Sequence, residues 1–342
     1  YDIHVLKTDS LGNELWITIY GGTMNDIADG VCQSTDGGYV VTGAAGVNNT
    51  MTSGDLLLLK LNENGDTVWT KTYGGSAFDF GSAICPTADG GYIICGLTHS
   101  FGSGGSDVWL LRADADGDTL WTRTYGGSAD EEAWAVQESA DGGCLLAGFT
   151  GSYGVGGWDV FVIKTDSSGA DVWTQTYGGS QYDIGLAIAQ TSDNGYVVTG
   201  TCNGQAQWLG GDQMLLKLDA AGGIEWATSV GGSEEDWGYS VCQAGDGGYV
   251  VGGKTASFGA GSFDAYLVKY GPEPGIEEYG EVAPDHRWPG ATIINGAITL
   301  PVGVSFRVFD ISGRSVAPDK MQPGIYFIEI EGEIAQKVVK VR

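Results

Sequence analysis

The strongest constraint on this chain is a sequence repeat of about 52 residues, a length typical of repeated β-sheet units. Each unit contains a Gly-Gly pair, a turn of the type Asp-Gly-Gly, an Asp followed five residues later by Lys or Arg, and a Trp. The Gly-Gly pairs are Gly21-Gly22, Gly74-Gly75, Gly126-Gly127, Gly178-Gly179 and Gly231-Gly232. Such a repeat predicts one structural element that is built several times over.

Each unit contains four short apolar runs of the kind that form β-strands. In one stretch of the sequence they fall at 55–60, 67–73, 80–85 and 92–96. Runs this short are below the length of an ordinary helix. The Asp-Gly and Asn-Gly turns between them favour tight hairpins, because such turns need residues that accept a positive φ. Four antiparallel strands in about 40 to 50 residues form a β-propeller blade, so we predict an all-β propeller.

The strand count suggests how many blades the propeller has. The repeat region contains 21 predicted strands, and five blades of four strands would use 20 of them. The chain begins with the third and fourth strands of a blade (2–20), and the repeats end with the first three strands (233–269). We therefore predict that these ends pair and close a five-bladed propeller over residues 1–270. The alternative is six blades, with strands missing upstream of Tyr1.

The charge balance limits which ligands this chain can attract. It has 43 Asp and Glu residues against 16 Lys and Arg residues, a net charge of -27. Nucleic acids and anionic membranes are therefore disfavoured as partners, because both attract positive surfaces. Cations and neutral ligands such as glycans stay open. No apolar run is long enough to span a membrane, and the opening residues lack a signal-peptide pattern, which leads us to expect a mature product or a fragment.

The sequence changes character after the last repeat. Residues 271–283 are rich in Gly, Pro and Glu and are predicted to be a linker, and residues 284–342 are predicted to form a small β domain. The segments Val308–Arg314, Pro323–Ile328 and Lys337–Arg342 resemble the C-terminal sorting domain of proteins exported by the type IX secretion system. This resemblance implies an immunoglobulin-like sandwich, export, and attachment to the cell surface.

The repeats themselves also resemble a known group. Their Asp-Gly-Gly-Tyr turns, as at Asp36–Tyr39 and Asp89–Tyr92, are similar to the Gly-rich "DGGY" repeats of secreted bacterial proteins, and the blade pattern is loosely kelch-like. In a kelch repeat the double Gly usually follows the second strand, whereas here it precedes the Tyr. The resemblance covers residues 1–270. It implies a secreted or cell-surface location and names no ligand.

One acidic residue follows each Gly-Gly pair by four positions. If these acids lie together at one mouth of the central channel, they could hold a cation such as calcium. The alternative is that each accepts a salt bridge or hydrogen bonds from backbone N–H groups. Another calcium candidate is the Asp-rich segment Asp114, Asp116 and Asp118, whose alternative is a hairpin turn. The five repeat acids are Asp26, Asp79, Glu131, Asp183 and Asp236.

Aromatic residues in the loops before the third strands are the candidate ligand-binding side chains. Exposed rings around a propeller mouth can stack on sugar faces. The alternative is that they pack between blades. These candidates are Phe101, Tyr153, Trp158, Trp208, Phe258 and Phe263.

Two cysteines suggest a cross-strand disulfide. Cys85 and Cys95 each lie five residues from Gly90 in an Asp-Gly-Gly turn, so they could face each other across two antiparallel strands. Export would make oxidation plausible. The alternative is two free thiols, because cross-strand geometry often suits a disulfide poorly.

From these features we predict a non-catalytic protein that serves binding, adhesion or extracellular structure. The expected partner is at the cell surface or outside the cell: a glycan, or a second copy in a homo-oligomer. No cofactor other than calcium is indicated. The alternative is a lectin or a secreted glycan hydrolase, which would need two suitably spaced carboxylates. Asp130, Glu132 and Glu138 break the repeat pattern in one unit and are thin support for a hydrolase.

Overall fold

The computed structural model describes residues 1–204, 211–259 and 261–272, together with the backbone of four strands between 292 and 340. The chain divides into two compact units, Tyr1–Ile276 and Glu277–Arg342. This division falls inside the segment predicted to be the linker, 271–283, most of which lies outside the described residues.

Four sheets of the first unit have four antiparallel strands each, and we number them blades 1 to 4. Blade 1 contains β3 (Asn25–Gln33), β4 (Tyr39–Val47), β5 (Asp55–Leu61) and β6 (Thr67–Tyr73). Blade 2 contains β7 (Asp79–Pro86), β8 (Tyr92–Thr98), β9 (Asp107–Ala113) and β10 (Thr119–Tyr125). Blade 3 contains β11 (Glu131–Glu138), β12 (Cys144–Thr150), β13 (Asp159–Thr165) and β14 (Asp171–Tyr177). Blade 4 contains β15 (Tyr182–Gln190), β16 (Tyr196–Gly204), β17 (Asp212–Leu218) and β18 (Ile224–Val230).

Two smaller sheets flank these blades. The N-terminal hairpin consists of β1 (Ile3–Thr8) and β2 (Glu14–Tyr20), and the last blade has three strands. The strands of the last blade are β19 (Asp236–Gln243), β20 (Tyr249–Thr255) and β21 (Asp264–Tyr270).

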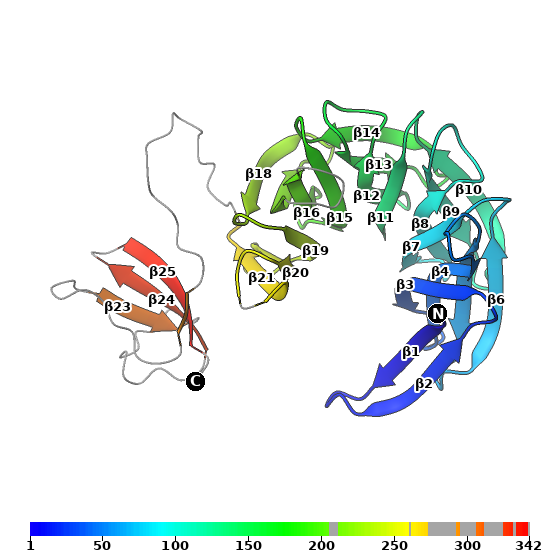
Figure 1. Cartoon of the computed structure of the whole chain (residues 1–342), viewed down its shortest axis with the longest axis horizontal. Coiled ribbons are helices and arrows are strands. Elements are labelled where there is room, and N and C mark those ends of the chain that lie inside the picture. Colours follow the sequence, from blue (N-terminus) through cyan, green and yellow to red (C-terminus); the bar gives the residue numbers. More distant parts are fainter. Residues whose placement is uncertain are drawn as a thin grey trace. The chain divides into compact units, whose positions relative to one another are not determined.

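The blades of the first unit follow one another in an arc, with the first strand of each full blade nearest the centre (Figure 1). Consecutive inner strands contact each other from β3 through β7, β11 and β15 to β19. The predicted all-β fold and its repeated four-stranded antiparallel sheets are thus confirmed for the described residues. The N-terminal hairpin and the last blade are separate sheets in the structure. The expected strand pairing between these two ends of the repeat region is therefore not present. The five-blade closure stays a prediction.

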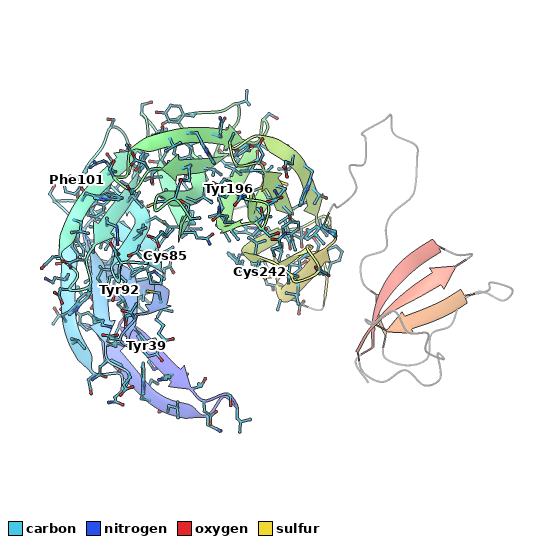
Figure 2. The ribbon with its side chains drawn as sticks, turned by 180° about the vertical axis from the view of Figure 1, so that it is seen from behind. Tyr39, Cys85, Tyr92, Phe101, Tyr196 and Cys242 are labelled. Atoms are coloured by element: carbon cyan, nitrogen blue, oxygen red, sulfur yellow. The ribbon has the colours of Figure 1, made fainter. Side chains whose placement is uncertain are left out.

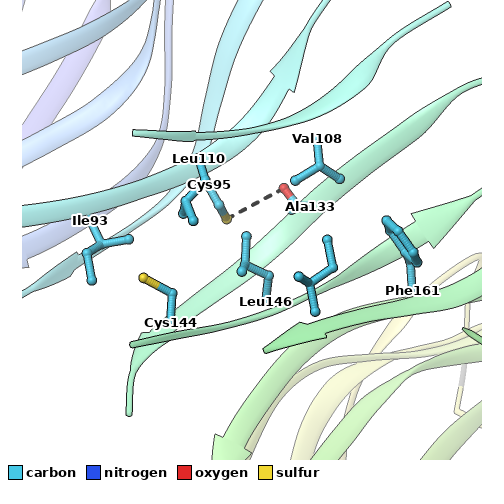
Figure 3. Packing of buried hydrophobic residues seen from close by; sticks show 9 residues of the cluster. Ile93, Cys95, Val108, Leu110, Ala133, Cys144, Leu146 and Phe161 are labelled. Carbon is cyan, nitrogen blue, oxygen red and sulfur yellow. Dashed lines mark hydrogen bonds between the residues drawn. The ribbon is translucent and has the colours of Figure 1, made fainter. Parts of the chain in front are cut away.

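The hydrophobic core lies between the blades. The third strand of each full blade alternates its side chains between two neighbours: Leu57 and Leu59 pack toward the N-terminal hairpin, whereas Leu56 and Leu58 pack toward blade 2. All four leucines have an exposed fraction of 0%. Figure 3 shows the next such cluster, in which residues of blade 2 meet Cys144, Leu146 and Phe161 of blade 3.

Each Asp-Gly-Gly turn is tied to the third strand of its own blade. In blade 2, Asp89 accepts a hydrogen bond from the N–H of Gly91 at 3.2 Å. Its carboxylate also forms an ion pair with the guanidinium of Arg112 at 2.5 Å. The middle residue of this turn, Gly90, has a φ of 89°. In blade 4 that position is Asn194 with a φ of 67°, and Asn tolerates this region better than most residues do. In blade 2 the repeat Arg is thus paired with the acid of the Asp-Gly-Gly turn.

The same ion pair recurs in the other blades. The pairs are Lys60–Asp36 at 2.7 Å, Lys164–Asp141 at 2.7 Å, Lys217–Asp193 at 2.9 Å and Lys269–Asp246 at 2.6 Å. The ammonium side chain is nearly buried inside the full blades, and it is 39% exposed at Lys269 in the last blade.

The described strands of the second unit form one mixed sheet. Its order is β22 (Thr292–Ile294), β25 (Glu333–Lys340), β24 (Gly324–Ile330) and β23 (Phe306–Asp310), and β22 pairs in parallel with β25. A sandwich needs a second sheet, so the immunoglobulin-like fold stays a prediction.

We predict that Asp141→Asn destabilises the protein by about 2 kcal/mol, because it leaves the buried Lys164 ammonium without its carboxylate. Hydrogen bonds from Lys164 and Ser139 lower the pKa of Asp141 to about 2. A carboxyl with a lowered folded-state pKa stabilises the fold above the unfolded value, here 3.8, and loses this effect as the pH falls through about 2. As the pH falls from 3.8 to about 2, the variant should therefore lose less stability than the wild type.

The matched control is Asp246→Asn, whose partner Lys269 is much more exposed. Its effect should be clearly smaller, because an exposed ion pair contributes little to stability. Thermal unfolding followed by circular dichroism at several pH values measures both variants. Equal effects at the two sites would contradict the role given to burial.

Candidate functional site

The five repeat acids hold the Gly-Gly turns. Asp79, the first residue of β7, is fully buried, and its Oδ2 accepts hydrogen bonds from the N–H of Gly75 at 2.9 Å and the hydroxyl of Ser100 at 2.7 Å. The hydroxyl of Thr98 donates to its other oxygen. The acid-to-glycine bond recurs in each unit, from Gly22, Gly127, Gly179 and Gly232 to Asp26, Glu131, Asp183 and Asp236.

A second acid comes close to the first glycine of each pair. A Cβ on Gly74 would clash with the carboxylates of both Asp55 and Asp79, which explains why this position has no side chain. Burial raises the pKa of Asp55, and the charge of Asp79 raises it further. The same arrangement of Gly126 with Asp107 and Glu131 shows that this acid pair belongs to the repeated junction.

These acids do not gather into one metal site. Among the residues that the structure describes, no three His, Cys, Asp or Glu side chains are placed to hold a metal ion. The hydrogen bonds instead match the alternative of backbone N–H partners. The segment at Asp114 forms a hairpin turn: its Oδ1 accepts from the N–H groups of Asp116 and Asp118, and Asp118 pairs with Lys71 at 2.6 Å.

Three of the predicted aromatic residues pack on their own blades. Phe101 contacts Trp109 with ring centroids 5.5 Å apart, Tyr153 stacks on Phe161 at 6.0 Å, and Phe258 stacks on Tyr266 at 5.6 Å. Each also lies over the Gly-Gly turn that leads from the preceding blade into its own blade. They therefore pack between blades, which was the alternative to a ring around the channel mouth. Phe101 and Tyr153 nevertheless remain 46% and 48% exposed.

A groove of about 640 Å³ opens beside Phe101. Figure 2 shows this residue toward the outer side of the first unit, and Cys85 of the inner strand β7 toward the inner side. The groove is lined by outer-strand residues of blades 1 and 2 and by the Phe101–Trp109 pair. Its lining is Thr72, Tyr73, Gly74, Phe101, Trp109, Leu111, Thr119, Thr122, Arg123 and Thr124.

At the next junction a tyrosine, Tyr153, takes the place of Phe101. The Tyr153 hydroxyl donates to the carbonyl oxygen of Gly126 at 3.0 Å and so bridges blades 2 and 3. Phe101 holds the equivalent position between blades 1 and 2 and has no hydroxyl to reach Gly74. The groove beside Phe101 therefore keeps a backbone carbonyl that Phe101 cannot bond.

The remaining aromatic candidates fall in different surroundings. Trp158 is 8% exposed, stacked on Phe149 with centroids 3.9 Å apart, and so belongs to the core rather than to an open platform. Phe263 is 53% exposed and lies 4.4 Å from the ammonium of Lys254. Trp208 lies outside the described residues.

Sequence reasoning missed the bulge positions of the inner strands. One residue is inserted into each inner strand after its pairing with the second strand has begun. A bulge changes the direction in which its side chain points. The residue at the bulge position is different in every unit. The residues are Asp29, Ser82, Trp134, Leu186 and Tyr239. Comparing the units would have revealed the variability, although the bulge itself appears only in the strand pairing.

Glu132 is the most unusual acid of the inner strands. The equivalent positions in the other units are apolar or aromatic: Ile27, Phe80, Ile184 and Trp237. Glu132 is half-buried and pairs in register with Phe149 of β12. Burial raises its pKa to about 7, and the charge of Asp130 contributes. This carboxyl is therefore poised to change protonation near neutral pH.

The possible disulfide between Cys85 and Cys95 is not formed, which matches the alternative of two free thiols. The hairpin is centred on Asp89 rather than Gly90, so Cys85 pairs with Ile93 and Cys95 pairs with Ala83. The Sγ of Cys95 lies 3.8 Å from the carbonyl oxygen of Ala133 in blade 3, as Figure 3 shows. All six cysteines are free thiols.

Comparisons with known proteins give remote similarities. No family model matches the chain. It is 26% identical to the regulatory protein FlaEY of Caulobacter vibrioides over 57% of this chain and 24% of that protein, so it spans about a quarter of that relative's length. A similar solved structure is the WD40 domain of Pan2 from Neurospora crassa (10% identity, TM-score 0.43, 92% of this chain and 79% of that one).

A second solved structure is an endo-1,5-α-L-arabinanase from Thermotoga petrophila, with 14% identity and a TM-score of 0.34, covering 89% of this chain and 84% of that one. These values assign neither a family nor an activity. In the described part of the chain, no helix has the length and apolarity needed to cross a membrane.

We predict that Glu132→Gln stabilises the protein by up to about 3 kcal/mol above pH 7. An acid whose pKa rises on folding favours the folded state only while it is protonated. Stability should therefore fall as the pH rises from 4.5, its ordinary value, through about 7. The variant should lose this dependence and match the wild type at low pH. Chemical denaturation across this pH range measures the effect, and a variant less stable than the wild type at pH 8 would contradict it.

Proposed function

We propose that this protein is a non-catalytic binding module that takes a neutral glycan in the groove beside Phe101. The groove itself carries the proposal. Its volume of about 640 Å³ lies within the range of small-molecule sites, which is about 300 to 1,000 Å³. It combines an exposed aromatic ring with threonine side chains, and sugars offer both an apolar ring face and hydroxyl groups.

Charge favours a neutral ligand over a polyanion. The net charge of -27 repels acidic polymers at long range. Arg123, which lines the groove, donates from its guanidinium to the carbonyl oxygen of Thr122 at 2.9 Å. Hydroxyl groups of a sugar can hydrogen-bond to the threonine side chains and to the carbonyl oxygen of Gly74.

The location of this activity follows from the two sequence resemblances. We propose a secreted or surface-attached protein whose "DGGY" repeats form the propeller and whose C-terminal unit is a type IX sorting domain of immunoglobulin-like fold. In this proposal the repeats close into a five-bladed ring, and a surface location brings the groove to extracellular glycans for adhesion or matrix building. Self-assembly into a homo-oligomer would be a further form of the same structural role.

The groove proposal predicts that Phe101→Ala weakens glycan binding at least about tenfold, the loss expected for one stacked ring. Phe101→Tyr should also weaken it, because a new hydroxyl would bond the carbonyl of Gly74 as Tyr153 bonds that of Gly126. Isothermal titration calorimetry with laminarin, galactomannan and dextran measures both variants. The control is Phe258→Ala, which removes the equivalent stack in the last blade. Binding that is unchanged in Phe101→Ala, or absent for all three polysaccharides, would contradict the proposal.

A glycan hydrolase is the second candidate, and Glu132 is the observation that favours it. A carboxyl with a pKa of about 7 is suited to act as a general acid at neutral pH. If this candidate is right, the protein releases reducing sugars from the same three polysaccharides, and Glu132→Gln abolishes the release. No release by the wild type argues for the binding module, whereas release that continues in Glu132→Gln excludes Glu132 as the catalytic acid.

A further inference from the structure

Lys254 of β20 lies among three aromatic rings in the last blade. Its ammonium is 4.6 Å from the ring centroid of Trp237, 4.4 Å from that of Phe263 and 6.0 Å from that of Tyr239. A carboxylate oxygen of Glu235 lies 3.8 Å from the same ammonium. The two rings of Trp237 and Tyr239 are themselves in contact, with centroids 6.0 Å apart. These contacts join the inner strand, the second strand and the loop before the third strand.

The positions of this cluster vary from unit to unit. Where the last blade has Lys254, the other units have Ala44, Leu97, Phe149 and Thr201. Where it has Phe263, they have Gly54, Ser106, Trp158 and Gly211. Tyr239 occupies the variable bulge position, and Glu235 replaces Asn25, Phe78, Asp130 and Tyr182. A residue that the common scaffold requires recurs in each unit, so these variable positions are free to carry a function of the last blade.

The cluster is open to solvent on its aromatic side. Tyr239 and Phe263 are 48% and 53% exposed, whereas Trp237 beneath them is 5% exposed. The side chain of Lys254 is 30% exposed and that of Glu235 is 20% exposed. The Lys254 side chain is therefore held by the rings while part of it still faces solvent.

We propose that Lys254, Glu235, Tyr239 and Phe263 form a second saccharide site, separate from the groove beside Phe101. A sugar presents an apolar ring face beside hydroxyl groups that both donate and accept hydrogen bonds. The exposed rings of Tyr239 and Phe263 supply the stacking surface, Lys254 supplies a donor, and Glu235 supplies an acceptor. Because the ammonium and the carboxylate neutralise each other, the site selects a neutral sugar. The ligand class rests on the proposed glycan-binding function, whereas the site itself does not.

The test uses saturation-transfer difference NMR on the full chain with glucose, galactose, mannose and N-acetylglucosamine as probes. The repeat offers a replacement for each residue that another blade already tolerates: Lys254→Thr, Phe263→Ser and Tyr239→Ser. We expect at least one sugar to give a signal with the wild type, and each variant to reduce that signal roughly fivefold, a loss of about 1 kcal/mol. Phe263 and Tyr239 are half exposed, so their variants should fold even if Lys254→Thr does not. Thermal unfolding checks this.

The outcomes separate this site from the groove. A signal that falls in the three cluster variants and persists in Phe101→Ala supports the second site. A signal that persists in all three cluster variants overturns it, as does the absence of any signal with the four sugars. A signal lost in Phe101→Ala and kept in the cluster variants also overturns the second site, while the proposed glycan binding in the groove stands.

Discussion

The structure of each full blade depends on one aspartate that binds two pieces of chain at once. Asp141 accepts a hydrogen bond from the N–H of Gly143 within its turn and pairs with Lys164 on the third strand. The turn orients the carboxylate, and the carboxylate neutralises a cation that would otherwise lie buried between two blades. Because the Lys side chain reaches along the sheet to the turn, the third strand can fill its remaining positions with apolar residues that face both neighbours.

The same logic shows why some features could be predicted from the sequence and others could not. The strands and turns follow from local patterns, so their order and length are visible in the residues. The register of a hairpin depends on where its turn is centred, and a shift of one position moved Cys85 away from Cys95. The outer groove beside Phe101 was missed because it depends on how two blades meet, which involves residues about 50 positions apart.

The repeat separates structural residues from candidates for function. Asp79 and its counterparts looked like a cation site in the sequence, yet their oxygens are occupied by backbone and hydroxyl donors. The candidate binding residues are found instead where one unit differs from the others: Phe101 against Tyr153, Glu132 against apolar residues, and Lys254 among unique aromatics. A chain that repeats its scaffold can change such positions one blade at a time, because the neighbouring blades keep the fold.

The third strands are buried on both faces, and this determines where local unfolding of the first unit begins. Leu110 and Leu111 of β9 lie in two different clusters, one shared with blade 3 and the other with blade 1. Neither face of β9 is therefore covered by its own blade alone, and a single blade lacks a core of its own. Stability in such an array is a sum of nearest-neighbour terms, so opening should begin at the outermost sheets and spread inward. Amide hydrogens of β9 and β13 would then exchange with solvent more slowly than those of β1 and β21.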